Sequence, residues 1–181
     1  GLSHVPDLPT QPRILDVGCG PGRQTLLLAR KTGGHITAVD THQPFLDALL
    51  ESARAQGLAS SITALNRSMM ELDFEPERFE LVWSEGAAYI MGFENALRSW
   101  RRFLKPGGCL GVTECVWLTE RPAPAVRAFW QSGYPAMLSV SANLALIRAS
   151  GYEVLHHFTL PESAWWNYYT PVRQRISRRR K

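Results

Sequence analysis

Apolar and polar positions follow two different periods along most of this chain. Short apolar runs of strand length lie at residues 13–17, 35–39, 62–65, 79–83 and 109–113. Between them, apolar residues recur every three or four positions, which predicts helices with one buried face at residues 24–31, 44–56 and 94–104. This alternation of strand and helix predicts a parallel sheet that is covered by helices on both faces.

The two ends of the chain carry weaker patterns. Residues 1–12 contain three prolines and no periodic apolar positions, which predicts a loop. The Lys-Pro-Gly-Gly run at residues 105–108 predicts the point where the preceding helix stops. The remaining pattern predicts helices near residues 125–130 and 141–149, a strand at residues 152–158 and an aromatic-rich segment at residues 165–169.

Composition adds the class of protein. The chain has 181 residues, 45% of them hydrophobic and 20% charged, which is typical of one soluble globular domain. It contains no run of about 18 apolar residues and no signal-peptide pattern, so we expect a cytoplasmic protein without a membrane span. Cys19, Cys109 and Cys115 lie in or beside apolar runs, and none has a partner at metal-ligand spacing. We expect three buried thiols and no metal site.

The formal net charge of +4 comes from the carboxyl-terminal end of the chain. Six of the 20 lysines and arginines lie there, at Arg173, Arg175, Arg178, Arg179, Arg180 and Lys181. The other 14 face 16 acidic residues, a formal charge of −2. A terminal basic cluster either docks on phosphate or is simply solvated. Because the chain has no Asn-Pro-Pro-Tyr run and no basic aromatic platform elsewhere, large nucleic-acid substrates are disfavoured.

Gly18, Gly20 and Gly22 lie between the first predicted strand and the first predicted helix. Glycines at such a turn permit positive φ and close approach of a ligand, and the following helix offers unpaired N–H groups. Dinucleotide-binding loops have the spacing G-x-G-x-x-G, and Arg23 occupies the position of their third glycine. The loop therefore predicts a nucleotide-like ligand but departs from the form that binds NAD.

Two acids flank this loop. Asp16 ends the first strand, where its carboxylate would repel a pyrophosphate and attract an ammonium group. Asp40 ends the second strand, where a carboxylate can accept hydrogen bonds from both hydroxyls of a ribose. A ligand with an ammonium at one end and a ribose further along satisfies both acids. The alternatives are that Asp16 caps the amides of the loop and that Asp40 caps the second helix.

The run ILDVGCGPG at residues 14–22, followed by ITAVD at residues 36–40, resembles the first two cofactor motifs of the class I S-adenosylmethionine (SAM) dependent methyltransferases. The similarity spans residues 13–113. It implies an α/β fold, a Rossmann-like three-layer sandwich with a mostly parallel sheet, here without the family's usual amino-terminal helix and seventh, antiparallel strand. Within a single domain (1–181), it implies a cofactor-binding half (13–115), an acceptor-side half (116–170) and a basic tail (171–181).

The resemblance also implies which residues bind the cofactor. The runs SMMELDF at residues 68–74 and LVWSEG at residues 81–86 are similar to a bacterial small-molecule-type subgroup related to the ubiquinone-biosynthesis methyltransferases. Ser68 stands where the family usually has an acid that meets the adenine amino group, and Met69 is expected to pack on the adenine ring. The expected cofactor-binding residues are Asp16, Gly18, Cys19, Gly20, Gly22, Asp40, Thr41, Ser68, Met69, Ser84 and Glu85.

Methyl transfer from a sulfonium is an in-line displacement, to which a protein contributes mainly by positioning the acceptor and excluding water. A dedicated catalytic residue is therefore not obligatory. If the acceptor must lose a proton, the candidate bases are Glu85, Tyr89, His156 and His157. The two histidines are expected on opposite faces of the strand at residues 152–158, so at most one points inward. A satisfied or surface histidine is the alternative for both.

Aromatic residues gather in the second half of the chain, at Trp117, Trp130, Trp165, Trp166, Tyr168 and Tyr169. They either line an apolar acceptor pocket or belong to the core or to an oligomer interface. The leading hypothesis is SAM-dependent methyl transfer to a small-molecule acceptor. The alternatives are a SAM-binding domain without catalysis, a nucleic-acid methyltransferase that docks through its basic tail, and an NAD-dependent oxidoreductase.

Overall fold

The computed structural model describes residues 2–6 and 8–179 of the chain. Its centre is a five-stranded sheet in the order β3-β2-β1-β4-β5, in which every neighbouring pair is parallel. The strands are β1 (Arg13–Val17), β2 (His35–Asp40), β3 (Ile62–Asn66), β4 (Phe79–Glu85) and β5 (Leu104–Thr113). The predicted α/β fold with a mostly parallel sheet is confirmed.

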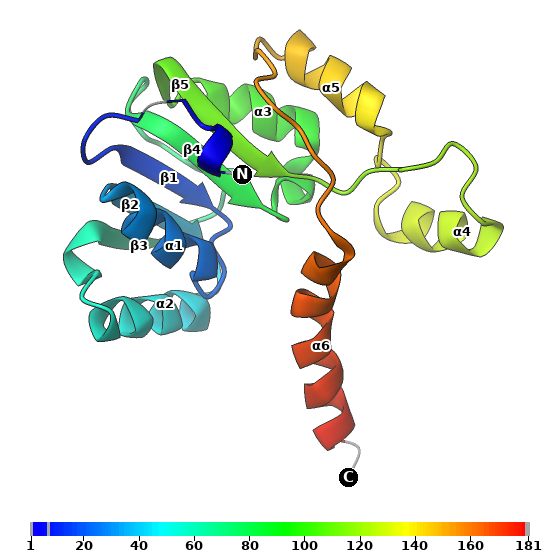
Figure 1. Cartoon of the computed structure of the whole chain (residues 1–181), viewed down its shortest axis with the longest axis horizontal. Coiled ribbons are helices and arrows are strands. Elements are labelled where there is room, and N and C mark those ends of the chain that lie inside the picture. Colours follow the sequence, from blue (N-terminus) through cyan, green and yellow to red (C-terminus); the bar gives the residue numbers. More distant parts are fainter. Residues whose placement is uncertain (1, 7, 180–181) are drawn as a thin grey trace.

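Helices cover both faces of this sheet, which makes three layers (Figure 1). Because successive side chains of a strand point to opposite faces, β1 contributes to two cores. Ile14 packs in the core beneath α1 and α2, whereas Leu15 and Val17 pack in the core beneath α3, around the fully buried Trp100. The helices are α1 (Arg23–Thr32), α2 (Gln43–Ala55), α3 (Phe93–Arg101) and α5 (Val140–Ala149), with short 3₁₀ helices η1 (Leu2–His4), η2 (Ala59–Ser61) and η3 (Ala88–Met91).

Strand β5 begins earlier than the sequence pattern predicts. The helix expected to run to residue 104 ends at Arg101, and Leu104 is already paired with Phe79 of β4. The register between the two strands then shifts, so that Leu81 pairs with Cys109. Residues 105–108 are thus an irregularity inside the strand. The predicted stop was misplaced because a Pro-Gly-Gly run also suits a bulged edge strand, where one side needs no hydrogen-bond partner.

The strand predicted at residues 152–158 is wrong. These residues run in an extended path from α5 toward α6, but none of the described residues pairs with them as a strand. Other contacts hold the segment: the Tyr152 hydroxyl donates to the Leu97 carbonyl at 2.8 Å, and the His156 ring stacks on His4 with centroids 3.7 Å apart. A strand needs a neighbour for its backbone groups, and periodicity alone does not supply one.

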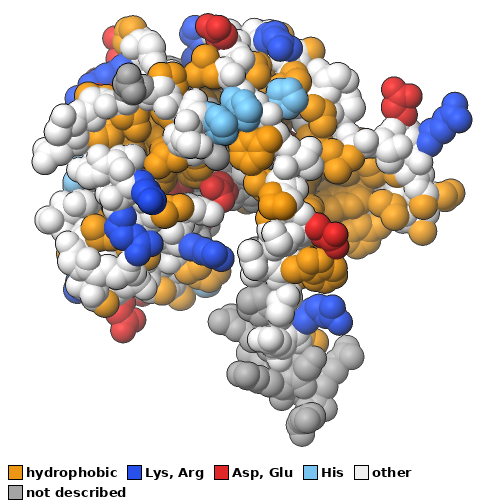
Figure 2. All heavy atoms as spheres, viewed as in Figure 1, with side chains coloured by type: hydrophobic (Ala, Val, Ile, Leu, Met, Phe, Trp, Pro, Cys, Tyr) orange, Lys and Arg blue, Asp and Glu red, His pale blue; other side chains and the backbone are white. Residues whose placement is uncertain are grey.

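Two helices extend away from the sheet (Figure 1): α4 (Pro124–Gly133) and α6 (Glu162–Arg179). Helix α6 contains the predicted aromatic segment and most of the predicted basic tail; Arg180 and Lys181 lie outside the described residues. Hydrophobic side chains gather on α4 and on the part of α6 nearest to it (Figure 2), where the Trp130 and Trp165 rings lie 6.3 Å apart. No helix among the described residues has the length and apolar character needed to span a membrane.

Candidate functional site

The glycine loop connects β1 to α1 at the carboxyl edge of the sheet, and its three glycines have different surroundings. All three adopt positive φ, which favours glycine. A β-carbon at Gly18 would lie 2.4 Å from Cβ of Ala87, and one at Gly22 would lie 2.2 Å from Cδ1 of Leu49. A β-carbon at Gly20 would meet nothing within 4 Å. Packing therefore demands glycine at two positions, whereas the backbone of Gly20 faces open space.

Asp40 holds this open loop in place. One carboxylate oxygen, Oδ2, accepts a hydrogen bond from the Gly20 amide at 2.9 Å, and the other, Oδ1, accepts one from the amide of His42 at 2.9 Å. His42 is the residue that precedes α2. The described hydrogen bonds of Asp40 therefore do not cap an amide of the second helix; they join the residue before α2 to the glycine loop. Each oxygen retains a lone pair for a further donor.

Asp16 is more enclosed than its position in the sequence suggests. Its side chain is 2% exposed, and its Oδ2 accepts a hydrogen bond from the Thr25 hydroxyl of α1 at 2.6 Å. The interpretation that Asp16 caps the loop is wrong, because the amides of Gly18 and Cys19 donate instead to the Val39 carbonyl. Burial raises the pKa of Asp16 to about 7, even though the Thr25 hydrogen bond lowers it.

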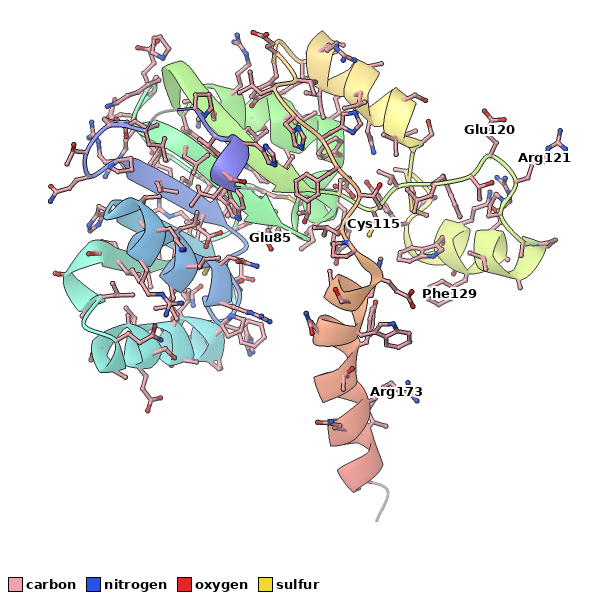
Figure 3. The ribbon with its side chains drawn as sticks, viewed as in Figure 1. Glu85, Cys115, Glu120, Arg121, Phe129 and Arg173 are labelled. Atoms are coloured by element: carbon pink, nitrogen blue, oxygen red, sulfur yellow. The ribbon has the colours of Figure 1, made fainter. Side chains whose placement is uncertain are left out.

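Glu85 ends β4 at the same edge and lies between α1 and α6 in the view of Figure 3. Its Oε2 accepts a hydrogen bond from the Gln24 amide group at 2.6 Å, and its Oε1 accepts one from the Trp83 indole at 3.1 Å. Desolvation raises the pKa of Glu85, against the lowering effect of both hydrogen bonds. The sequence prediction missed Gln24 and Trp83, although Gln24 lies in the first turn after the glycine loop, where a long amide side chain can reach the edge.

Of the remaining residues predicted to bind the cofactor, Cys19 and Met69 lie at the glycine loop, whereas Thr41 and Ser68 follow the strands β2 and β3. Cys19 is buried in the core beneath α1 and α2, and Met69 lies so near the loop that its Cε would be 3.6 Å from a β-carbon at Gly18. Thr41 is exposed after β2, and the Ser68 hydroxyl accepts a hydrogen bond from the Met70 amide at 3.2 Å.

Ser84 lies on the other face of the sheet from Glu85, because neighbouring strand residues alternate. Its hydroxyl is buried and has no hydrogen-bond partner in the described part of the chain. The structure thus does not bring the Ser84 side chain to the three carboxyl groups. Among the predicted thiols only Cys19 is buried; Cys109, on the edge strand β5, and Cys115, which lies beyond the end of that strand, are half-buried.

The candidate bases are dispersed. Tyr89, in η3, is 46% exposed, and its ring centroid lies 5.7 Å from that of Tyr134. His156 stacks on His4, and His157 is exposed. No described hydrogen bond joins either His156 or His157 to the carboxyl groups around the glycine loop.

Glu114 is a further acid at this edge that the sequence prediction missed. It follows β5 directly, and its Oε1 accepts a hydrogen bond from the Cys115 amide at 2.9 Å. Burial raises the pKa of Glu114, while the nearby Tyr134 hydroxyl lowers it. Its only signal in the sequence is its position immediately after the fifth apolar run.

The arrangement suits a ligand that carries both positive charge and hydroxyl groups. Asp16, Asp40 and Glu85 end three neighbouring strands around the open Gly20 backbone, and Asp40 and Glu85 each raise the pKa of Asp16 further. A cation placed among these carboxyl groups would relieve their mutual repulsion. Residues 2–6 and 8–179 hold no group of three or more potential metal ligands.

Comparison with known proteins identifies the family. A family model described as a methyltransferase domain matches residues 14–108. A sterol 24-C-methyltransferase of Gibberella zeae is 28% identical over 182 aligned residues, which cover 94% of this chain and 47% of the relative. The chain spans about half the length of the curated relatives it matches.

Solved structures agree with this match. A SAM-dependent methyltransferase from Geobacter sulfurreducens, in complex with S-adenosylhomocysteine, is 24% identical with a TM-score of 0.81, over 90% of this chain and 66% of that chain. The [4+2]-cyclase SpnF is 32% identical with a TM-score of 0.69, over 82% of this chain and 54% of that chain. The chain therefore belongs to the methyltransferase-domain family and has the fold of the class I SAM-dependent methyltransferases.

Proposed function

We propose that this protein binds SAM at the glycine loop and transfers its methyl group to a small-molecule acceptor. The observation that carries the proposal is the open backbone of Gly20, which lies beside Asp40 and is the one glycine of the loop that packing does not explain. A glycine with positive φ and no neighbour on its open side leaves room for a ligand to approach the backbone closely. The three carboxyl groups around it favour a cationic ligand over an anionic dinucleotide.

In this proposal, different residues bind the ribose, the methionine end and the adenine of SAM. Asp40 accepts hydrogen bonds from the ribose hydroxyls with the lone pairs that Gly20 and His42 leave free. Asp16 and Glu85 attract the positively charged methionine end, and Met69 packs against the adenine. Gln24 and Trp83 hold the Glu85 carboxylate in one orientation, so that it needs no rearrangement when the ligand arrives.

SAM supplies an electrophilic methyl group when bound. The acceptor attacks that carbon as the carbon–sulfur bond breaks, and the residues of this chain act by holding the acceptor in line and excluding water. Glu85 is half-buried and its pKa is raised by desolvation, so a positive ligand beside it would stabilise its charged form and be stabilised in turn. The similarity to a sterol methyltransferase supports an apolar small molecule as the acceptor.

A second candidate function has one specific observation in its favour. The [4+2]-cyclase SpnF has a similar fold and is 32% identical to this chain, yet its name assigns it a different reaction. In that alternative, the glycine loop holds SAM or its product without methyl transfer. The alternative of a nucleic-acid substrate that docks on the basic tail is not addressed by the structure: Arg180 and Lys181 and the side chains of Arg175, Arg178 and Arg179 lie outside the described residues.

The test is a calorimetric titration of the chain with S-adenosylhomocysteine and with NAD⁺. The wild type should bind S-adenosylhomocysteine and not NAD⁺. Gly20→Ala should weaken S-adenosylhomocysteine binding at least about tenfold, because a methyl group would occupy the open face. Preference for NAD⁺, or no binding of either ligand, contradicts the proposal.

Gly33→Ala is the matched control. Gly33 also has positive φ, +63° against +53° for Gly20, and a β-carbon there also meets nothing within 4 Å. Both substitutions should lower the free energy of unfolding by about 1 kcal/mol through the backbone conformation. Only the substitution at Gly20 should change ligand affinity; equal affinity of the two variants argues against a ligand on this loop.

A further inference from the structure

Glu114 lies next to the candidate cofactor site. The residue before it, Thr113, pairs with Glu85 across β4 and β5, and the Thr113 hydroxyl accepts a hydrogen bond from the Gly86 amide at 2.9 Å. Cys115, the residue after Glu114, lies at the same edge of the sheet as Glu85 (Figure 3). Glu114 is therefore placed beyond the carboxyl end of β5, on the side of Glu85 away from the glycine loop, since β1 lies across β4 from β5.

The hydrogen bonds of the Glu114 carboxyl group are incomplete. Oε1 accepts from the Cys115 amide at 2.9 Å, whereas Oε2 is buried and has no hydrogen-bond partner among the described residues. The Tyr134 hydroxyl interacts with this carboxyl group, but the contact falls short of full hydrogen-bond geometry. A buried carboxylate oxygen without a donor is destabilising, so a third group that donates to it would stabilise the site.

Two aromatic rings lie near this carboxyl group and come from separate elements. Tyr134, whose hydroxyl interacts with Glu114, follows α4, and Tyr89 belongs to η3, which follows β4. Their ring centroids lie 5.7 Å apart at 55°, so the two rings contact each other, and Tyr89 is 46% exposed and can contact a ligand. Apolar surface and one hydrogen-bond acceptor thus meet beside the place where the methyl group would be presented.

We propose that Glu114 and Tyr134 form an acceptor subsite that takes the hydroxyl group of an apolar, ring-containing molecule. This inference rests on the proposed function and names its substrate class. Glu114 accepts the hydrogen bond from the acceptor hydroxyl, and Tyr134 and Tyr89 contact its ring. The neighbouring Glu85 remains with the cofactor, so the two acids have separate tasks.

The protonation states agree with these roles. Burial raises the pKa of Glu114, so this carboxylate is a stronger base than an exposed one. Burial and the Glu114 charge raise the pKa of Tyr134 to about 12, so its hydroxyl stays protonated at neutral pH and remains a donor. In the transfer, the acceptor oxygen forms a bond to the methyl carbon while the carbon–sulfur bond breaks. The hydroxyl proton passes to Glu114, and S-adenosylhomocysteine leaves as a neutral thioether.

The experiment uses the full chain loaded with S-adenosylhomocysteine and two probes, 1-naphthol and 1-methoxynaphthalene. The probes have the same rings, and only the first can donate a hydrogen bond. The wild type should bind 1-naphthol at least about tenfold more tightly than 1-methoxynaphthalene, as one hydrogen bond to a charged group would give. Glu114→Gln should reduce this ratio to about threefold or less, whereas Tyr134→Phe keeps the ring and should leave the ratio unchanged.

Controls separate this inference from the proposed function. Glu120→Gln makes the same chemical change as Glu114→Gln at a residue outside the subsite, on the loop before α4, and Figure 3 shows Glu120 far from Glu85. It should keep the wild-type ratio, and all three variants should bind S-adenosylhomocysteine with wild-type affinity. A wild type without preference for 1-naphthol overturns the inference, as does an unchanged ratio in Glu114→Gln. Absence of S-adenosylhomocysteine binding by the wild type counts instead against the proposed function.

Discussion

At the scale of single residues, burial distinguishes the acids at the carboxyl edge of the sheet. Asp40 is partly exposed and bonded to two amides, Glu85 is half-buried between an amide and an indole, and Asp16 is enclosed with only the Thr25 hydroxyl as a described partner. Burial penalises the charged form of a carboxyl group, and Asp16 has the least compensation. Its protonation is therefore coupled to folding.

We expect stability to fall as Asp16 ionises. In the unfolded chain its pKa is near 3.8, and in the folded chain it is about 7, so between these values the folded state binds the extra proton. The free energy of unfolding then decreases as pH rises from 4 to 7. Asp16→Asn removes this dependence, so its free energy of unfolding should rise by about 4 kcal/mol relative to that of the wild type between pH 4 and pH 8.

Urea denaturation of both proteins at pH 4, 6 and 8 measures this difference. Asp47→Asn, at an exposed position of α2, is the control and should follow the wild type at every pH. A difference between Asp16→Asn and the wild type that stays constant with pH would show that the folded protein keeps Asp16 charged throughout.

The sequence allowed the residues of the loop to be predicted better than their partners. Asp16, Asp40 and the three glycines are at the strand ends where spacing put them, because a parallel sheet brings all its carboxyl ends to one edge. Their hydrogen bonds were not predictable. The hydrogen-bond partner of Asp16, Thr25, lies in the first turn of α1. Two carboxyl groups raise the pKa of Asp16, and one of them, Glu85, is far from it along the chain. Such contacts depend on the packing of helices, which periodicity does not describe.

At the scale of elements, the pairing of β4 with β5 supports the site. Gly111 of β5 pairs with Trp83 of β4, and a β-carbon at Gly111 would lie 2.3 Å from the Trp83 ring. Trp83 in turn donates its indole N–H to Glu85 at 3.1 Å. Because Gly111 has no side chain, the Trp83 ring can lie against β5 and hold the Glu85 carboxylate by its indole N–H.

We expect Gly111→Ala to displace the Trp83 ring and destabilise the fold by about 1–3 kcal/mol, the usual cost of overpacking. Thermal or urea unfolding measures the loss. In the background of Trp83→Leu the same substitution should cost much less, because the ring that it strikes is gone. Equal costs in both backgrounds would mean that the two side chains do not contact each other.

The strands that the sequence predicted well are those that the apolar runs mark from their first residue. Strands β1, β2, β3 and β4 all have the predicted starts, although β3 is an edge strand. Strand β5 starts earlier than predicted, because the Pro-Gly-Gly run separates its first residue from its apolar run. Residues 152–158 form no strand, because none of the described strands pairs with them.

At the scale of the whole molecule, order is expected to decrease away from the sheet. Both faces of the sheet are packed with buried side chains. Helix α4 has no buried residue and leaves Phe129 70% exposed, and Trp165 and Trp166 of α6 are also largely exposed. Regions with few buried apolar contacts open at low free energy.

Hydrogen exchange should reveal this gradient. Amides of β1 and β4 should exchange only through global unfolding, whereas those of α4 and α6 should exchange at least about a hundredfold faster, corresponding to local opening. Helix α3 is the control, because it is of similar length to α4 but buries four of its residues, Phe93, Ala96, Leu97 and Trp100. Protection of α4 equal to that of α3 would contradict the expectation and indicate that its apolar surface is covered in solution.

The negative charge around the glycine loop also bears on how a catalytic cycle would end. In the proposed reaction the sulfur arrives as a cation and leaves as a neutral thioether, while Asp40 and Glu85 stay in place. Attraction that helps to hold the donor is thereby lost at the moment of transfer. We expect the product to be held less tightly than the donor for this reason, so that loss of the positive charge favours product release.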